Sequence, residues 1–264
     1  MPINVTVWHE YHHEHKNPTV AKHYPDGMHV VMKSAIEEHL GSAVNVTTAT
    51  QEQDANHGLS DELLAKTDVM TWWGHARHGD VKDEIVEKVV KRVWEGMGLV
   101  VLHSGHYSKP FKRLMGTGCC LKWREAAEKE RLWCVSPGHP VTVGLEKDYI
   151  ELPQTEMYGE HFDVPEPDET AFISWFEGGE VFRSGMGWKR GAGKVFYFRP
   201  GHETFPIYHN PEVRRVLANM VDYVKPHAST VKYEPKAPNI PNPLSPIAGE
   251  HEVDASMHDN PENK

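Results

Sequence analysis

Apolar positions divide the first hundred residues into alternating strands and helices. Runs typical of strands cover residues 3–8, 44–48, 68–73 and 99–102. Apolar residues at helical spacing cover 28–40 and 81–95, the latter capped by Asp80, and Ser60 caps a short helix, S-D-E-L-L-A-K. This alternation predicts a doubly wound, mainly parallel sheet with helices on both faces.

The pattern is less regular in the second half of the chain. It predicts strands over 155–162, 171–176, 181–184 and 194–198, and a helix over 212–223 that Pro211 opens. From Pro226 onward the chain is rich in Pro, Asn, Ser and acidic residues and has no periodicity. We therefore expect one α/β domain over residues 1–225 and an extended or disordered tail over 226–264.

Composition and charge exclude several classes of function. The 264 residues carry a net charge of -10, and their 28 Lys and Arg are interspersed with acids, which argues against nucleic acid or an anionic membrane as partner. No apolar run approaches the roughly 18 residues of a membrane span, and the first strand leaves no room for a signal peptide, so we expect a cytoplasmic protein. The three cysteines are odd in number, lack zinc-finger spacing and lie at no strand end, which predicts neither disulfides nor thiol chemistry.

Nineteen histidines stand against this ordinary background, and many follow predicted strands. The strand ends carry His9 with Glu10, His75 with His78, residues 103–106, and residues 199–203. Ligands of open parallel sheets bind outside the carboxyl ends of the strands. We therefore expect these groups to face one cleft, where imidazoles suit either metal binding or proton transfer.

The turn L-H-S-G-H at residues 102–106 resembles a nucleophile elbow in its setting but lacks the G-x-S-x-G motif. Ser104 is better placed to shape the turn or contact a ligand than to act as nucleophile. The spacing of His103 and His106 allows both to bind one divalent metal, Zn or Mn, in an open site. The predicted metal ligands are His103, His106, Glu160 and His202.

Aromatic residues gather near the same strand ends, where they suit a wall against a sugar ring, although large aromatics are most often core. We assign Trp72, Trp94 and Trp175 to the core. The predicted substrate-binding residues are Trp8, Glu10, Trp73, His75, Ser104 and Tyr158.

Three strings match a known family in order and spacing. The stretches GMGLVVLHSGH, HPVTVGL followed by EMY, and GKVFYFRPGHE followed by NPEVRRVLANMVDYV resemble the trehalose-utilisation ThuA-like family over residues 3–225. The resemblance implies a flavodoxin-like three-layer sandwich of the class I glutamine amidotransferase-like superfamily. Its amidotransferases carry a cysteine nucleophile and a histidine where this chain has His103 and Arg199. Glutamine hydrolysis through a thioester is therefore excluded, although the fold is retained.

The resemblance also implies a function. Members of the family are associated with use of trehalose and related sugars, often beside sugar oxidoreductases that form keto sugars. We expect an isomerase, lyase or hydrolase that acts on a trehalose-related or keto sugar by acid/base or metal-assisted chemistry, without a nucleotide cofactor. His103 and His202 are the expected acid/base residues, Glu156 and Glu203 orient them or act as base, and Arg199 supplies positive charge.

Two other functions stay open, and the expected partners are few. The chain could be a non-catalytic carbohydrate-binding or regulatory protein, or a metal-dependent hydrolase of amide or ester bonds. The expected ligand is a small carbohydrate, with no nucleic acid and no membrane. A functional link to a sugar oxidoreductase and a homo-oligomer, in which the tail could pack on a neighbouring subunit, are also predicted.

Overall fold

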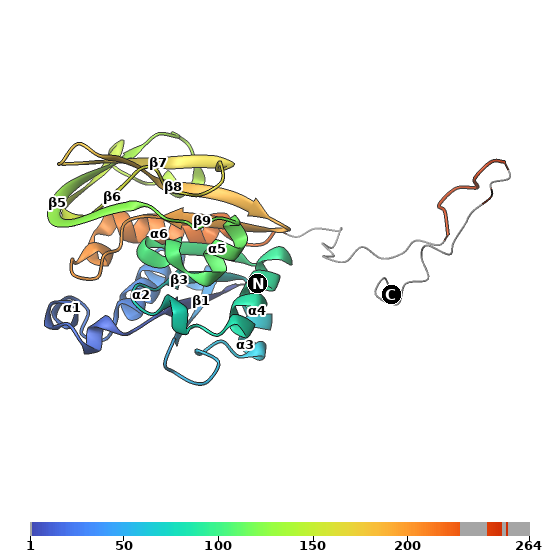
Figure 1. The fold of residues 1–264 in the computed structure, drawn as a ribbon, viewed down its shortest axis with the longest axis horizontal. Helices are drawn as coiled ribbons and strands as arrows, with labels where there is room; N and C mark the ends of the chain where they lie inside the picture. The colour runs from blue at the N-terminus through green and yellow to red at the C-terminus, as the bar shows by residue number, and fades with distance from the viewer. Residues whose placement is uncertain (1, 228–241, 250–251, 253–264) are drawn as a thin grey trace.

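A nine-stranded sheet organises the protein in the computed structural model, which describes residues 2–227, 242–249 and 252 (Figure 1). The strand order is β2-β1-β3-β4-β9-β8-β7-β5-β6. The bounds are β1 (Ile3–His9), β2 (Val44–Thr50), β3 (Val69–Trp73), β4 (Gly98–Leu102), β5 (Lys122–Cys134), β6 (Tyr149–Gly159), β7 (Glu169–Phe176), β8 (Val181–Arg190) and β9 (Gly193–Phe198). Most of the predicted tail from Pro226 lies outside the described residues.

Helices cover both faces of the sheet around β1, β3, β4 and β9 and bury two apolar clusters against it (Figure 1). On one face pack α2 (Met28–Leu40) and α6 (Pro211–Val224), with α1 (Pro18–His23) beside them. On the other face pack α3 (Asp61–Lys66), α4 (Asp83–Trp94) and α5 (Lys109–Met115). The predicted α/β three-layer fold is confirmed.

The sheet consists of two halves with different strand directions. Strands β2, β1, β3, β4 and β9 are mutually parallel, whereas β8, β7, β5 and β6 continue the sheet by antiparallel pairing. All five residues of β3 and of β4 are buried, as expected where helices cover both faces. The parallel half is the doubly wound unit of the sequence prediction, and the antiparallel half makes the whole sheet mixed.

Several predicted elements differ from the structure in extent. The α4 helix begins at Asp83 with Lys82 as N-cap, because residues 78–80 form a separate 3-10 turn, so Asp80 does not cap it. The strand predicted over 155–162 is the end of the longer β6, and the one over 181–184 is the start of β8. No prediction covered β5, α1 or α5.

The predicted core tryptophans do not all lie in the core. Trp72 is buried at 1% exposure, but Trp94 is 38% and Trp175 37% exposed. Trp94 ends the α4 helix, and Trp175 lies on a face of β7 that points away from the apolar clusters. No helix among the described residues is long and apolar enough to cross a membrane.

Candidate active site

Histidines from three loops meet at the carboxyl ends of the parallel strands. The chain runs from β1 outward to β2 and returns to β3, so strand order reverses between β1 and β3, where ligands of such sheets bind. The ring centroids of His75, His103 and His202 lie 5.3–6.3 Å apart. These rings follow β3, β4 and β9, which are neighbours in the sheet.

His103 is a buried, neutral imidazole whose tautomer is set by its hydrogen bonds. Its Nδ1 lies 2.9 Å from the Arg199 carbonyl oxygen, which can only accept, so Nδ1 carries the proton and Nε2 the lone pair. The ring stacks on Tyr158, whose hydroxyl lies 3.3 Å from Nε2. Burial, together with the Arg199 charge, lowers the pKa of His103 to about 3.

The backbone turn that presents His103 is tight. His103 has a φ of 49°, uncommon for a residue with a side chain and frequent at functional sites. A Cβ on Gly105 would lie 2.9 Å from the Trp72 carbonyl oxygen, so only glycine fits there. The Ser104 hydroxyl donates to the Gly74 carbonyl at 2.8 Å. Ser104 therefore joins the two loops, which is the turn-shaping role expected of it.

Glu156 lies between two imidazoles. It comes from β6 in the antiparallel half, is 4% exposed, and places Oε2 3.2 Å from His103 Nε2 and 3.7 Å from His202 Nε2. This oxygen has no hydrogen-bond partner among the described residues. Burial raises the pKa of Glu156. The carboxylate oxygen thus faces a deprotonated ring nitrogen without a hydrogen bond of its own, and it is poised to accept a proton.

His202 presents the opposite tautomer. The Thr204 amide donates to His202 Nδ1 at 3.2 Å, and the Thr204 hydroxyl lies 2.8 Å from the same nitrogen. Its proton therefore sits on Nε2, which lies 3.7 Å from both Glu125 and Glu156. Burial lowers the pKa of His202, which keeps this ring neutral. His103 and His202 can therefore act as proton acceptor and proton donor on either side of Glu156.

Glu203 is the second buried carboxylate of the site. Its Oε1 lies 2.6 Å from Nδ1 of both His13 and His75. Burial disfavours its charge, but these two imidazoles hold the pKa of Glu203 well below its usual range. For His75, burial is outweighed by Glu203, which raises the pKa of His75 to about 8. The three side chains form one hydrogen-bonded or ion-paired unit.

Glu10 holds the loop that carries His75. It is 1% exposed, and its carboxylate accepts the backbone N–H groups of His75, Ala76 and Arg77 at 2.8, 3.1 and 2.9 Å. Three amide donors stabilise a buried carboxylate and fix the loop around it. Glu10 thus positions His75 instead of facing a substrate.

A cavity of about 430 Å³ opens beside these groups. Its wall is made of His75, His78, Ser104, His106, Tyr107, Cys120, Leu121, Trp123, Glu125, Glu156 and Tyr158. Trp123 pairs with Tyr158 across β5 and β6, so both side chains lie on one face of the sheet. Tyr158 is buried whereas Trp123 is 65% exposed, which places them at the floor and the mouth of the cavity.

The structure places two predicted catalytic or metal residues elsewhere. The buried Arg199 guanidinium pairs with Glu130 on β5 and donates to the Glu156 carbonyl at 2.7 Å. A buried charge needs a partner of opposite sign, so Arg199 cannot offer its charge to a substrate as expected. Glu160 pairs with Arg183 at 2.9 Å, which takes it out of the predicted metal set.

Three further predicted residues have other partners. Trp8 stacks on Trp72 at 3.8 Å in the core and does not reach the cavity. Trp73 donates its indole N–H to the Gly201 carbonyl at 3.0 Å, and its ring stacks on His9. His106 lines the cavity, but its Nδ1 faces the Cys119 carbonyl at 2.7 Å. Among the described residues it joins no cluster of convergent metal ligands with His103.

Sequence reasoning missed His13 and Trp123. His13 belongs to the bunch H-E-Y-H-H-E-H after the first strand, but nothing in that run distinguishes it from His12 or His15. It lies in the 3-10 turn η1 (His13–His15), which brings it onto Glu203. Trp123 lies at the start of β5, which carried no strand signal.

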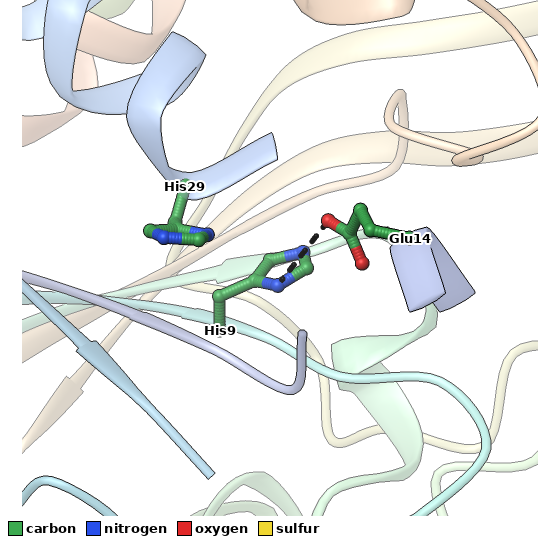
Figure 2. A group of neighbouring side chains, drawn as sticks. All are labelled: His9, Glu14 and His29. Atoms are coloured by element: carbon green, nitrogen blue, oxygen red, sulfur yellow. Dashed lines mark ion pairs between the residues drawn. The ribbon is translucent and has the colours of Figure 1, made fainter. Parts of the chain in front are cut away.

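Four groups of described side chains could hold a metal ion. Within each group, one ligand atom per residue lies within 4.8 Å of the others. The groups are His9, Glu14 and His29 (Figure 2); His13, His75 and Glu203; His103, His202 and Glu203; and Glu125, Glu156 and His202. Three of the four groups lie in the site described above. The fourth, which contains His9, lies next to the site, because the His9 ring stacks on Trp73.

Comparison with known proteins identifies related sequences and folds. The model of the ThuA family, described as trehalose utilisation, matches residues 4–224. No curated protein matches the chain. A ThuA-like protein from Parabacteroides merdae superposes with a TM-score of 0.64 at 16% identity, over 90% of this chain and 95% of that one.

Two further solved structures share the fold. A ThuA-like protein from Bacteroides uniformis has a TM-score of 0.58 at 15% identity, over 83% of this chain and 89% of that one. A cytoplasmic protein from Salmonella typhimurium has a TM-score of 0.57 at 10% identity, over 84% of this chain and 100% of that one. At these identities the likeness shows the fold alone.

Proposed function

The chain belongs to the ThuA family of trehalose utilisation, and on this premise we propose that it is an enzyme that removes a proton beside the keto group of an oxidised, trehalose-related sugar. The observation that carries the proposal is Glu156 at the cavity wall, with its unpartnered Oε2 between the deprotonated His103 Nε2 and the protonated His202 Nε2. A carboxylate backed by two imidazoles of opposite tautomer is suited to move protons.

Glu156 is the proposed general base. Its carboxylate takes the proton from the carbon next to the keto group, and the C–H electron pair becomes the C=C bond of an enolate while the carbonyl oxygen takes the negative charge. Burial raises the pKa of Glu156, which makes it a stronger base than an exposed carboxylate. His103 acts through Glu156: its deprotonated Nε2, which lies 3.2 Å from Glu156 Oε2 and also contacts the Tyr158 hydroxyl, is positioned to share the proton.

His75 is the proposed donor to the enolate oxygen. It lines the cavity, and its Nδ1 is engaged by Glu203, which leaves Nε2 as the nitrogen that a ligand can reach. An N–H aimed at developing negative charge lowers the barrier to enolate formation. For an isomerisation, the former carbonyl oxygen takes a proton from His75, the hydroxyl on the deprotonated carbon gives its proton back to His75 and becomes the new carbonyl, and Glu156 returns its proton to the former carbonyl carbon. Departure of the glycosyl oxygen on the β carbon, with a proton from His202, completes an elimination.

Aromatic side chains support a sugar as the substrate. Trp123 and Tyr107 are 65% and 46% exposed, yet both belong to the cavity wall. Exposed aromatic faces beside polar groups suit a ligand with an apolar ring face and a polar edge. The net charge of -10, with Lys and Arg interspersed among acids, agrees with a small polar ligand.

Proton exchange in heavy water tests the proposal. The protein is incubated with 3-keto-trehalose or a 3-keto-glucoside in D₂O. Proton NMR then follows the signals of the protons on the two carbons beside the keto group. We expect exchange or conversion well above the enzyme-free rate, and none with the unoxidised glycoside. Binding of the keto sugar without exchange would favour the non-catalytic carbohydrate-binding protein. Hydrolysis of amides or esters that a chelator abolishes would favour the metal-dependent hydrolase.

Other features stay predictions. They are the homo-oligomer, the functional link to a sugar oxidoreductase, the cytoplasmic location and the lack of a nucleotide cofactor.

A further inference from the structure

The four groups of side chains that could hold a metal ion differ in which lone pairs are free to coordinate it. A histidine binds a metal through a deprotonated ring nitrogen, and its other nitrogen then carries the proton. A nitrogen that already accepts a backbone N–H cannot carry that proton or reach an ion unless the backbone moves. The fixed backbone donors of the structure therefore decide among the groups.

In the group of His9, Glu14 and His29, backbone N–H groups already occupy two of the possible ligand atoms (Figure 2). His9 Nδ1 accepts the Tyr11 amide at 2.8 Å, and Glu14 Oε1 accepts the Met28 amide at 3.1 Å. His9 Nε2 therefore carries the proton of a neutral ring, and coordination there would require Nδ1 to become a donor against Tyr11. This group is better explained as buried polar residues that hold η1 to the start of α2.

The two groups that contain His202 have a similar conflict. The Thr204 amide donates to His202 Nδ1, so coordination through Nε2 would leave a proton on Nδ1 facing that donor. Glu125, a member of one of these groups, is also exposed to solvent, with 48% of its side chain accessible. Neither group offers three free ligand atoms.

We propose that His13, His75 and Glu203 form a binding site for one divalent transition-metal cation. Nδ1 of each histidine lies 2.6 Å from Glu203 Oε1, and the two rings are nearly perpendicular, at 86° with centroids 5.2 Å apart. No described residue hydrogen-bonds Nε2 of either ring, so each ring can keep its proton there while Nδ1 coordinates. This inference deepens the proposed function and, as regards the reaction, rests on it.

Two buried atoms of this group lack a hydrogen-bond partner. His13 Nδ1 approaches Glu203 closely, but it is buried without a hydrogen bond of acceptable geometry. Glu203 is 3% exposed, and its Oε2 has no partner among the described residues. Buried polar atoms are seldom left unpaired, and a cation bound between the two side chains would satisfy both atoms. Cis ligands of a metal lie about 3 Å apart, so small side-chain shifts would admit the ion.

The surrounding structure fixes the two histidines. Glu10 accepts three amides of the His75 loop, and η1 fixes His13 at the end of β1. Two imidazoles and one carboxylate leave coordination positions for water or substrate oxygen, and this set suits Zn²⁺, Mn²⁺ or Fe²⁺. With the ion on its Nδ1, His75 would still present an N–H on Nε2 to the cavity. The ion would therefore support the donor role of His75 toward a keto oxygen.

Metal titration of the whole, untagged chain tests the site without any sugar. The protein is stripped with a chelator and titrated with Zn²⁺ and with Mn²⁺ by calorimetry, and with Co²⁺ by visible absorption. We expect one ion per chain. His13→Gln and Glu203→Gln should each weaken binding about 100-fold or more, since even residues that only orient metal ligands matter 10–100-fold. His12→Gln, the neighbouring histidine outside the group, should bind as the unchanged chain does.

His13→Gln keeps the test decisive if Glu203→Gln does not fold, because His13 is the less buried residue; circular dichroism checks both variants. Absence of stoichiometric binding would overturn the proposal, as would undiminished binding in His13→Gln. Loss of the ion in His29→Gln instead would place it in the group of Figure 2 and also overturn the proposal. Proton exchange by Glu156 is measured separately, so either result can fail without the other.

Discussion

The two halves of the sheet contribute to the site in different ways. The parallel strands β3 and β4 have five residues each, are buried on both faces and end in loops that carry histidines. The antiparallel strands β5, β6 and β8 have 13, 11 and 10 residues and are partly exposed. They contribute Glu156, Tyr158, Trp123 and the counter-charge Glu130. The parallel half thus positions imidazoles, and the antiparallel half supplies the carboxylate and closes the cavity.

Replacing Glu156 by Gln tests whether the antiparallel half carries the chemistry. The amide keeps the shape but cannot take a proton, so we expect kcat for the keto sugar to fall about 10²–10⁴-fold, the range of a lost general base. Binding of the keto sugar should change little. Steady-state kinetics and deuterium exchange measure both effects.

Glu125→Gln is the matched control, because Glu125 also lines the cavity and lies 3.7 Å from His202 Nε2. It should lower kcat far less than Glu156→Gln. Equal losses in the two variants would mean that the charge of the cavity matters and that Glu156 is not the specific base. Full activity of Glu156→Gln would move the chemistry back to the parallel half.

Glu130→Ala tests how strongly the antiparallel half is joined to the parallel half. Glu130 and Arg199 are both fully buried, and removal of one partner leaves the other charge unpaired inside the protein. We expect the free energy of unfolding to fall by about 3–5 kcal/mol. Urea unfolding followed by circular dichroism measures this. Glu151→Ala removes the exposed pair with Arg131 on the next strand and should barely change the midpoint.

The sequence predicted the parallel half much better than the antiparallel half, for a physical reason. A parallel strand covered on both faces is an apolar run, and β4, G-L-V-V-L, is visible as such. Strand β5 reads K-W-R-E-A-A-E-K-E-R-L-W-C, and its Ala, Glu, Lys and Arg favour helix over strand as single residues. Pairing with β6 and β7 decides its structure, and a local pattern does not contain that information.

The candidate site divides in the same way. The position of His75, His103 and His202 at strand ends followed from the topology rule. The partner of Arg199 could not be predicted, because Glu130 lies in the unpredicted β5, and Arg199 was therefore expected to face a substrate. His13 was one of several equivalent histidines in a polar loop, and only the turn at residues 13–15 distinguishes it.

The pH dependence of the rate separates Glu156 from the histidines. Burial raises the pKa of Glu156, and the base must be ionised to work. As pH falls through this raised pKa, kcat/KM should fall tenfold per unit, and it should level off above it. A histidine base in the parallel half would place the inflection elsewhere, near 3 for His103, whose pKa burial lowers, or near 8 for His75, whose pKa Glu203 raises. A rate profile from pH 4 to 9, with structure checked by circular dichroism, distinguishes these cases.

Trp123→Ala should have the smallest effect, because it removes only a wall of the cavity. Loss of one aromatic face is worth about 0.5–1.5 kcal/mol, so KM for a keto-glycoside should rise about twofold to twelvefold while kcat stays nearly constant. Trp133→Ala, on the same strand but outside the cavity wall, should leave KM unchanged. A fall in kcat of the Trp123 variant would show that Trp123, at the mouth of the cavity, also orients the reacting carbon. The antiparallel half would then act through Trp123 as well as through Glu156. An unchanged KM would mean that the sugar is held at the floor of the cavity alone, beside Tyr158 and the histidines of the parallel half.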